Sequence, residues 1–165
     1  SESLLTFVIE IIIKQKEDKQ MKKIILSAAL CIAVATSACA DDDKPIQFSQ
    51  LPQTAQQFVK QYFGNEKVAL AKMESDFFGK NYDIIFANGD KVEFDGAGNW
   101  EEVKCRYSEV PSALVPQQIL QYVRNTYPDT KVVKLEKKRN GHEVKLSNGW
   151  ELEFNRNFEL IDMDN

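Results

Sequence analysis

The chain has 165 residues and a formal net charge of −4, and 43% of its residues are hydrophobic and 28% charged. This composition is typical of a globular protein and excludes a disordered or fibrous one. An acidic chain lacks the basic surface that phosphate recognition needs, so we expect no nucleic-acid partner and no anionic membrane partner.

The first forty residues predict export. A basic start at residues 21–23 precedes an apolar run at 24–35 and the small-residue site Ala38-Cys39-Ala40. This order is that of a secretory signal peptide (21–40), cleaved after Ala40. The run is too short to span a bilayer, so we expect no transmembrane segment after processing. Residues 1–20 are interpreted as an upstream extension that is not native, with a genuine long leader as the alternative.

The leader leaves one alternative open, because Cys39 could carry a lipid. An acidic stretch follows it, as in surface lipoproteins, but Thr36 stands where such leaders usually have leucine. We therefore expect a periplasmic or secreted protein, with an outer-membrane lipoprotein anchored at Cys39 as the alternative. After cleavage only Cys105 remains, so no internal disulfide is expected.

An internal repeat predicts the domain organisation. Leu51-Pro52-Gln53 recurs as Val115-Pro116-Gln117, and the Asn88-Gly89 turn recurs as Asn148-Gly149. Further along, the repeat matches Trp100 with Phe158. The sequence thus divides into a flexible acidic segment (41–50), a first repeat (51–105), a linker (106–114) and a second repeat (115–165).

Each repeat begins with an amphipathic pattern. Apolar residues recur at helical spacing after Leu51 and again after Val115, and Pro52 and Pro116 stand where a first-turn proline is tolerated. Gly64 and Pro128 are expected to end the two helices.

Alternating residues then predict strands. Tyr82, Ile84 and Phe86 alternate before an Asn-Gly turn, and Val92 and Phe94 alternate after it. The same pattern returns after residue 141. The predicted fold class is α+β, with two tandem helix-plus-four-strand repeats and the helices packed on one face of an antiparallel sheet.

The other face of this sheet is expected to be polar and open. It supplies the predicted partner-binding residues Glu93, Lys145, Glu151 and Glu153. Trp150 is added because it has no aromatic counterpart in the first repeat, and aromatic residues are common at the centres of interfaces.

The chain offers little for catalysis or metal binding. His142 is the only histidine of the whole chain. No paired ligand spacing accompanies it or Cys105, and the glycine-rich loop at residues 95–99 lacks the regular oxygen ligands of a calcium loop. We therefore expect no enzyme activity, no cofactor and no metal.

The hairpin pattern that begins at Tyr82-x-Ile84-x-Phe86-x-Asn88-Gly89 and ends at Gly98-x-Trp100 resembles the PepSY-like, β-lactamase-inhibitor-protein-like envelope proteins of Gram-negative bacteria. The resemblance extends from Leu51 to the end of the sequence. It implies tandem helix-plus-four-strand units, a periplasmic or secreted setting, and a role in binding or inhibiting other proteins. It carries no catalytic residues over to this chain.

Two hypotheses for function follow. The first is a non-catalytic envelope protein that binds or inhibits an unknown envelope protein or peptide through the polar face. The alternative is a periplasmic carrier of a small ligand or metal ion, which would use the cleft between the repeats.

Overall fold

The computed structural model describes residues 43–76 and 79–165. The predicted leader, its cleavage site at Ala40 and Cys39 lie outside this part. The described elements include two α-helices, α2 (Gln53–Tyr62) and α3 (Gln117–Thr126), and a short 3-10 helix, η1 (Phe48–Gln50). The strands are β1 (Lys44–Ile46), β2 (Val68–Asp76), β3 (Gly79–Phe86), β4 (Lys91–Phe94), β5 (Trp100–Lys104), β6 (Val132–Lys138), β7 (Gly141–Leu146), β8 (Glu151–Asn155) and β9 (Leu160–Asp164).

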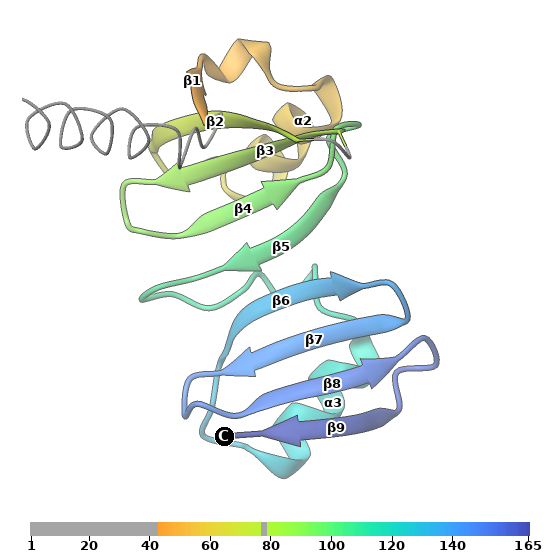
Figure 1. The fold of residues 1–165 in the computed structure, drawn as a ribbon. Helices are drawn as coiled ribbons and strands as arrows, with labels where there is room; N and C mark the ends of the chain where they lie inside the picture. The colour runs from red at the N-terminus through yellow and green to blue at the C-terminus, as the bar shows by residue number, and fades with distance from the viewer. Residues whose placement is uncertain (1–42, 77–78) are drawn as a thin grey trace, which may run out of the picture. The chain divides into compact units, whose positions relative to one another are not determined.

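The nine strands of the described residues form one antiparallel sheet, in which each strand lies beside its neighbours in the sequence (Figure 1). The prediction of two tandem helix-plus-four-strand repeats is therefore wrong. Strand β5 pairs directly with β6, and β1 adds a strand at the edge beside β2. The sheet continues from β5 to β6 because an unpaired edge of β5 would leave its backbone N–H and C=O groups without partners. Instead the Cys105 N–H donates to the Val133 carbonyl over 2.8 Å.

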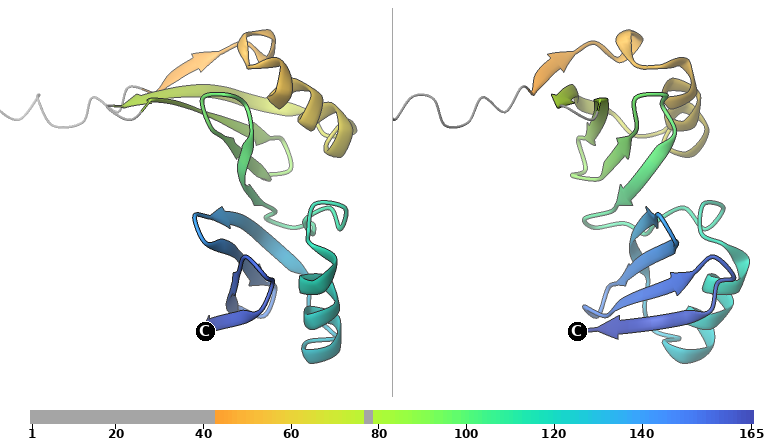
Figure 2. Two further views of the ribbon diagram at one scale, coloured as in Figure 1. Left: turned by 90° about the vertical axis from the view of Figure 1, so that its right-hand side faces the viewer. Right: turned by 45° about the vertical axis from the view of Figure 1, so that its right-hand side comes forward.

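Both helices lie on the same face of the sheet (Figures 1 and 2). Their apolar stripes explain this, because Ala55 and Val59 of α2 and Ile119 and Val123 of α3 are all buried. The inward-facing residues of the strands join them in one hydrophobic core. No helix in the described ranges covers the opposite face, which is left for charged side chains.

The turn between β4 and β5 and the turn between β8 and β9 have the same hydrogen-bond pattern. The Asp95 N–H donates to the Asn99 carbonyl, and the Asn155 N–H donates to the Glu159 carbonyl, each over 2.9 Å. Gly98, in the first turn, has a φ of 84°, and Phe158 takes the same place in the second with a φ of 62°. The predicted match of Trp100 with Phe158 is therefore wrong. Phe158 lies in the turn where the earlier hairpin has a glycine.

Candidate binding surface

A row of acidic side chains crosses the open face of the sheet. Directly paired residues on neighbouring strands point to the same face, so the register places them side by side. We call this set the acidic row. In order from β3 to β9 its members are Asp83, Glu93, Glu102, Glu136, Glu143, Glu153 and Asp162, each the cross-strand partner of the next.

A second row runs beside the first and changes sign along its length. It contains the paired residues Lys91, Lys104, Lys134 and Lys145 from β4 to β7, and then continues with Glu151 and Asp164 on β8 and β9. Lysines therefore lie next to most of the acidic row, but at β8 and β9 the neighbours are acidic as well.

The part of the acidic row on β3 and β4 is neutralised. Asp83 is buried, and its Oδ2 lies 2.7 Å from the Lys91 ammonium and 3.2 Å from that of Lys72. Lys91 also contacts Glu93 at 2.7 Å. Two ammonium groups thus compensate a carboxylate that would be costly to bury alone.

Lys134 neutralises the middle of the row. Its ammonium lies 3.1 Å from Glu102, 2.7 Å from Glu136 and 3.0 Å from Glu143. Partial burial opposes the charged form of Lys134, but these three carboxylates hold its pKa above the ordinary value. Burial likewise opposes the charged forms of Glu136 and Glu143, yet Lys134 and Lys138 hold their pKa values below the ordinary range.

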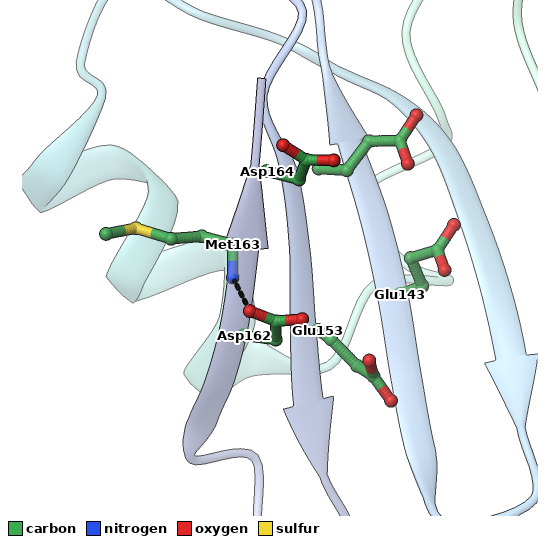
Figure 3. A pocket seen from close by; sticks show the side chains of 6 residues that line it. Glu143, Glu153, Asp162, Met163 and Asp164 are labelled. Atoms are coloured by element: carbon green, nitrogen blue, oxygen red, sulfur yellow. Dashed lines mark hydrogen bonds between the residues drawn. The ribbon is translucent and has the colours of Figure 1, made fainter.

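The β7–β9 end of this face differs. We call its five carboxylates the acidic end: Glu143, Glu151, Glu153, Asp162 and Asp164. They line an open hollow of about 200 Å³ (Figure 3). Lys145 pairs with Glu151 at 2.6 Å. Glu153, Asp162 and Asp164 make no ion pair with any residue that the structure describes.

This arrangement can attract a cation or a cationic surface. Like charges placed opposite one another on adjacent strands repel, and solvent weakens the repulsion only partly at this spacing. Within the described ranges, however, no three histidine, cysteine or acidic side chains are arranged to hold a metal ion. The carboxylates are spread over three strands instead of converging on one point.

The predicted site residues separate into groups. Glu151 and Glu153 belong to the acidic end, and Lys145 adjoins it. Glu93 lies in the neutralised part of the row. Trp150 is half-buried, with its ring 6.2 Å from that of Tyr127 beyond the end of α3, so it packs against the helix side of the sheet.

The prediction missed Asp162 and Asp164. A signal was available in Ile161-Asp162-Met163-Asp164, where apolar and acidic residues alternate with the period of a strand. Only the register of β9 against β8 shows that Asp162 joins the acidic row and that Asp164 joins the second row beside it.

His142 and Cys105 lie in separate surroundings. The His142 ring lies 5.6 Å from the Phe158 ring, tilted by 35°, and burial and the charge of Lys137 lower the pKa of His142. Cys105 is buried, and burial raises the pKa of its thiol to about 11. A thiol with such a pKa is a poor nucleophile at neutral pH.

In the comparison with protein families, residues 80–162 match the family described as "Putative beta-lactamase-inhibitor-like, PepSY-like". The chain belongs to the PepSY-like family. The matched residues include four of the five carboxylates of the acidic end, all but Asp164, and most of the sheet. No curated protein is similar to the chain.

Three solved structures of similar proteins come from Bacteroides. A periplasmic protein of the DUF2874 family from Bacteroides vulgatus is 59% identical, covers 77% of this chain and 100% of its own, and has a TM-score of 0.73. A protein from Bacteroides thetaiotaomicron, described as calcium-regulated and periplasmic, is 60% identical with the same coverage and a TM-score of 0.74. A second Bacteroides vulgatus protein, described as periplasmic and of unknown function, is 34% identical, covers 74% of this chain and 99% of its own, and has a TM-score of 0.71.

These relatives confirm the predicted periplasmic location, since all three are described as periplasmic. No helix in the described part of this PepSY-like chain is long and apolar enough to cross a membrane.

Proposed function

We propose that this PepSY-like protein is a non-catalytic periplasmic binding protein that holds a cationic surface of another envelope protein or peptide on its acidic end. One observation carries the proposal. Lysines neutralise the acidic row from β3 to β6, whereas Glu153, Asp162 and Asp164 at β8 and β9 have no lysine partner among the described residues.

Unpaired carboxylates in adjacent positions reduce the stability of a sheet, so this surface is unfavourable for the protein alone. A partner that brings lysine or arginine side chains would remove the repulsion on binding. The field of the clustered carboxylates would also speed the encounter with such a partner. Lys134 illustrates the contact we expect, because one ammonium serves three carboxylates of the same row.

The family supports a protein or peptide as the partner. Its description compares the family with a β-lactamase inhibitor, and an inhibitor acts by binding its enzyme, which is a protein. We propose the binding and not the inhibition of a particular enzyme, because fold similarity does not fix the target.

Photo-crosslinking in the native envelope tests this function. A photoreactive side chain replaces Glu151 at the acidic end in one variant and Lys104, on the neutralised part of the same face, in the control. We expect a discrete crosslinked protein for the first position, lost when Glu153 and Asp162 are also changed to glutamine and asparagine. Equal crosslinking from both positions, or a product unaffected by neutralisation, would contradict the proposal.

A divalent cation is the second candidate for the acidic end. Five carboxylates line one hollow, and one relative is described as calcium-regulated. Oxygen ligands suit Ca²⁺, which tolerates irregular coordination. The present spread of the side chains would have to contract around the ion.

Calcium titration separates the two candidates. If Ca²⁺ is the ligand, millimolar or lower Ca²⁺ raises the melting temperature of the wild-type protein more than Mg²⁺ does, and the Glu153→Gln change removes the difference. If the ligand is a cationic protein, Ca²⁺ acts only as a screening salt, and Mg²⁺ at equal ionic strength has the same effect.

A further inference from the structure

Strand β9 has an open outer edge. It pairs with β8, and no other described strand lies beside it. The Met163 N–H donates to Oδ1 of Asp162 over 2.9 Å, and the Asn165 N–H donates to Oδ1 of Asp164 over 2.8 Å. Side chains of the preceding residues therefore occupy main-chain donors that a neighbouring strand would otherwise use.

The same edge exposes apolar side chains. Ile161 and Met163 are 55% and 53% exposed, and they are two of the four large hydrophobic residues that are exposed in the described ranges. Met163 is the cross-strand partner of the buried Leu152, so it extends the row of core residues to the edge. An added strand could cover it.

Strand β5 shows what such coverage looks like in this protein. A register shift interrupts the β4–β5 pairing at Glu93/Phe94, as one interrupts the β8–β9 pairing at Glu153/Phe154. β6 lies on the outer edge of β5, with Leu135 opposite Val103 and Lys134 opposite Lys104. Val103 is fully buried there, in contrast to Met163.

Charge selects the strand that fits β9. In a second copy of this chain, pairing of β9 with β9 would bring four aspartates together, which like-charge repulsion opposes. A strand with basic side chains on the open face would place them beside Asp162, Asp164 and the rest of the acidic end. Lys134 of β6 already binds acidic side chains on both of its neighbouring strands in this way.

We propose that β9 binds its partner by strand addition: an extended cationic segment pairs with its outer edge. Basic residues lie opposite Asp162 and Asp164, and an apolar residue lies opposite Met163. Main-chain hydrogen bonds and alternate side chains would share the recognition, as in other cases of added strands. This inference rests on the proposed function and specifies how the cationic partner is held.

Hydrogen exchange of individual amides tests the binding mode. The probe is a capped heptapeptide of alternating lysine and valine, used with the whole exported chain at low salt. We expect the Met163 and Asn165 amides to exchange about tenfold more slowly when the peptide is bound. The control peptide has the same sequence with N-methylated backbone amides, which keep its charge but cannot pair as a strand.

The Met163→Pro variant provides a second test. Its proline removes an N–H on the open edge and is tolerated best in an edge strand. We expect it to weaken binding of the alternating peptide about tenfold. The control Met163→Leu keeps the N–H and an apolar side chain and should bind like the wild type. The Leu152 and Val144 amides report whether each variant retains the sheet.

The outcomes separate this inference from the proposed function. Slower exchange at Met163 and Asn165, with loss of binding for the methylated peptide and for Met163→Pro, supports strand addition. Equal binding of both peptides, abolished by Glu153→Gln, overturns strand addition but keeps the cationic surface. No binding of either peptide by the wild type overturns both, and self-association through β9 overturns the choice of occupant.

Discussion

The Lys134 ammonium lies 3.0 Å from the Glu143 carboxylate, and Glu143 is the last member of the acidic row, counted from β3, that a lysine neutralises. Glu143 on β7 still has Lys134 and Lys138 as partners. Its neighbour Glu153 on β8 has no ion pair among the residues described. The change occurs between two directly paired residues and defines the surface to which we assign binding.

Removal of Lys134 should destabilise the fold. Lys134→Met leaves Glu102 without a cation and leaves Glu136 and Glu143 with Lys138 alone. Because these groups are partly solvated, we expect the free energy of unfolding to fall by about 1–2 kcal/mol. Urea unfolding measures this. The matched control is Lys104→Met, because Lys104 is exposed at the directly paired position, and its effect should stay within about 0.5 kcal/mol. Equal losses in the two variants would show that the ion-pair cluster is not stabilising.

Neutralisation of the acidic end should raise the free energy of unfolding. Glu153 lies between Glu143 and Asp162 in the register, so Glu153→Gln removes two repulsive neighbours. We expect unfolding to cost about 0.5 kcal/mol more at low salt, and this gain to shrink as ionic strength rises. A stabilising change that also weakens binding is the pattern of a surface kept for function. Destabilisation by Glu153→Gln would indicate a structural role instead.

The Gly98 turn should tolerate no side chain. Gly98 has a φ of 84°, and an added Cβ would lie 2.7 Å from the Pro52 side chain. We expect Gly98→Ala to lower the free energy of unfolding by about 2–4 kcal/mol, because backbone strain and the clash with Pro52 add up. Thermal or urea unfolding measures it.

Phe158, at the matching position of the second turn, supplies the comparison. Phe158→Gly relieves the positive φ at this position but removes the ring contact with His142, so the net change in the free energy of unfolding should stay within about 1 kcal/mol. A larger loss of unfolding free energy for Phe158→Gly than for Gly98→Ala would contradict this explanation of the two turns.

His142 should make stability depend on pH. Burial and the charge of Lys137 place its folded pKa below the ordinary 6.5. The unfolded chain therefore binds the proton more readily, and the contribution of neutral His142 is present above pH 6.5 and decreases as the pH falls toward the folded value. We expect His142→Gln to lose less stability than the wild type between about pH 7 and about pH 5. Parallel pH profiles for the two proteins would exclude this cause.

Asp90 should control access to Cys105. The buried Asp90 carboxylate accepts hydrogen bonds from the Arg106 N–H at 2.8 Å and the Ser108 hydroxyl at 2.7 Å, and so fixes the segment after β5. In the wild type we expect the thiol to react slowly with iodoacetamide. Asp90→Ala should speed the labelling and cost about 2–3 kcal/mol of stability. Unchanged labelling would mean that this segment does not shield the thiol.

The sequence pattern predicted much of the local structure. The stripes of apolar residues identified both helices, and the Asn-Gly turns identified the hairpins, because these signals depend only on neighbouring residues. Pairing of β5 with β6 was not predicted, because the intervening segment carries no signal for which strands adjoin. The match of Trp100 with Phe158 failed since aromatic character was given more weight than the turn geometry that places Phe158 with Gly98.

The candidate site could be predicted in part. Alternation placed Glu151 and Glu153 on the open face. It could not distinguish them from Glu93, because alternation does not show which carboxylate a lysine contacts: Lys91 of the same strand pairs with Glu93, whereas no described lysine pairs with Glu153. Trp150 was selected for its residue type, and its packing against Tyr127 depends on where α3 ends.

Calorimetry with neutralised variants tests the central claim most directly. One variant changes Glu153, Asp162 and Asp164 to glutamine and asparagine, and the control makes the same changes at the exposed Glu66, Asp129 and Glu109, with an equal change in net charge. The titrant is the cationic envelope partner recovered by crosslinking, or the lysine–valine peptide if none is recovered. We expect the first variant to bind at least about tenfold more weakly and the control to bind like the wild type. Equal losses in both would show that binding follows overall charge, and would contradict a site at the acidic end.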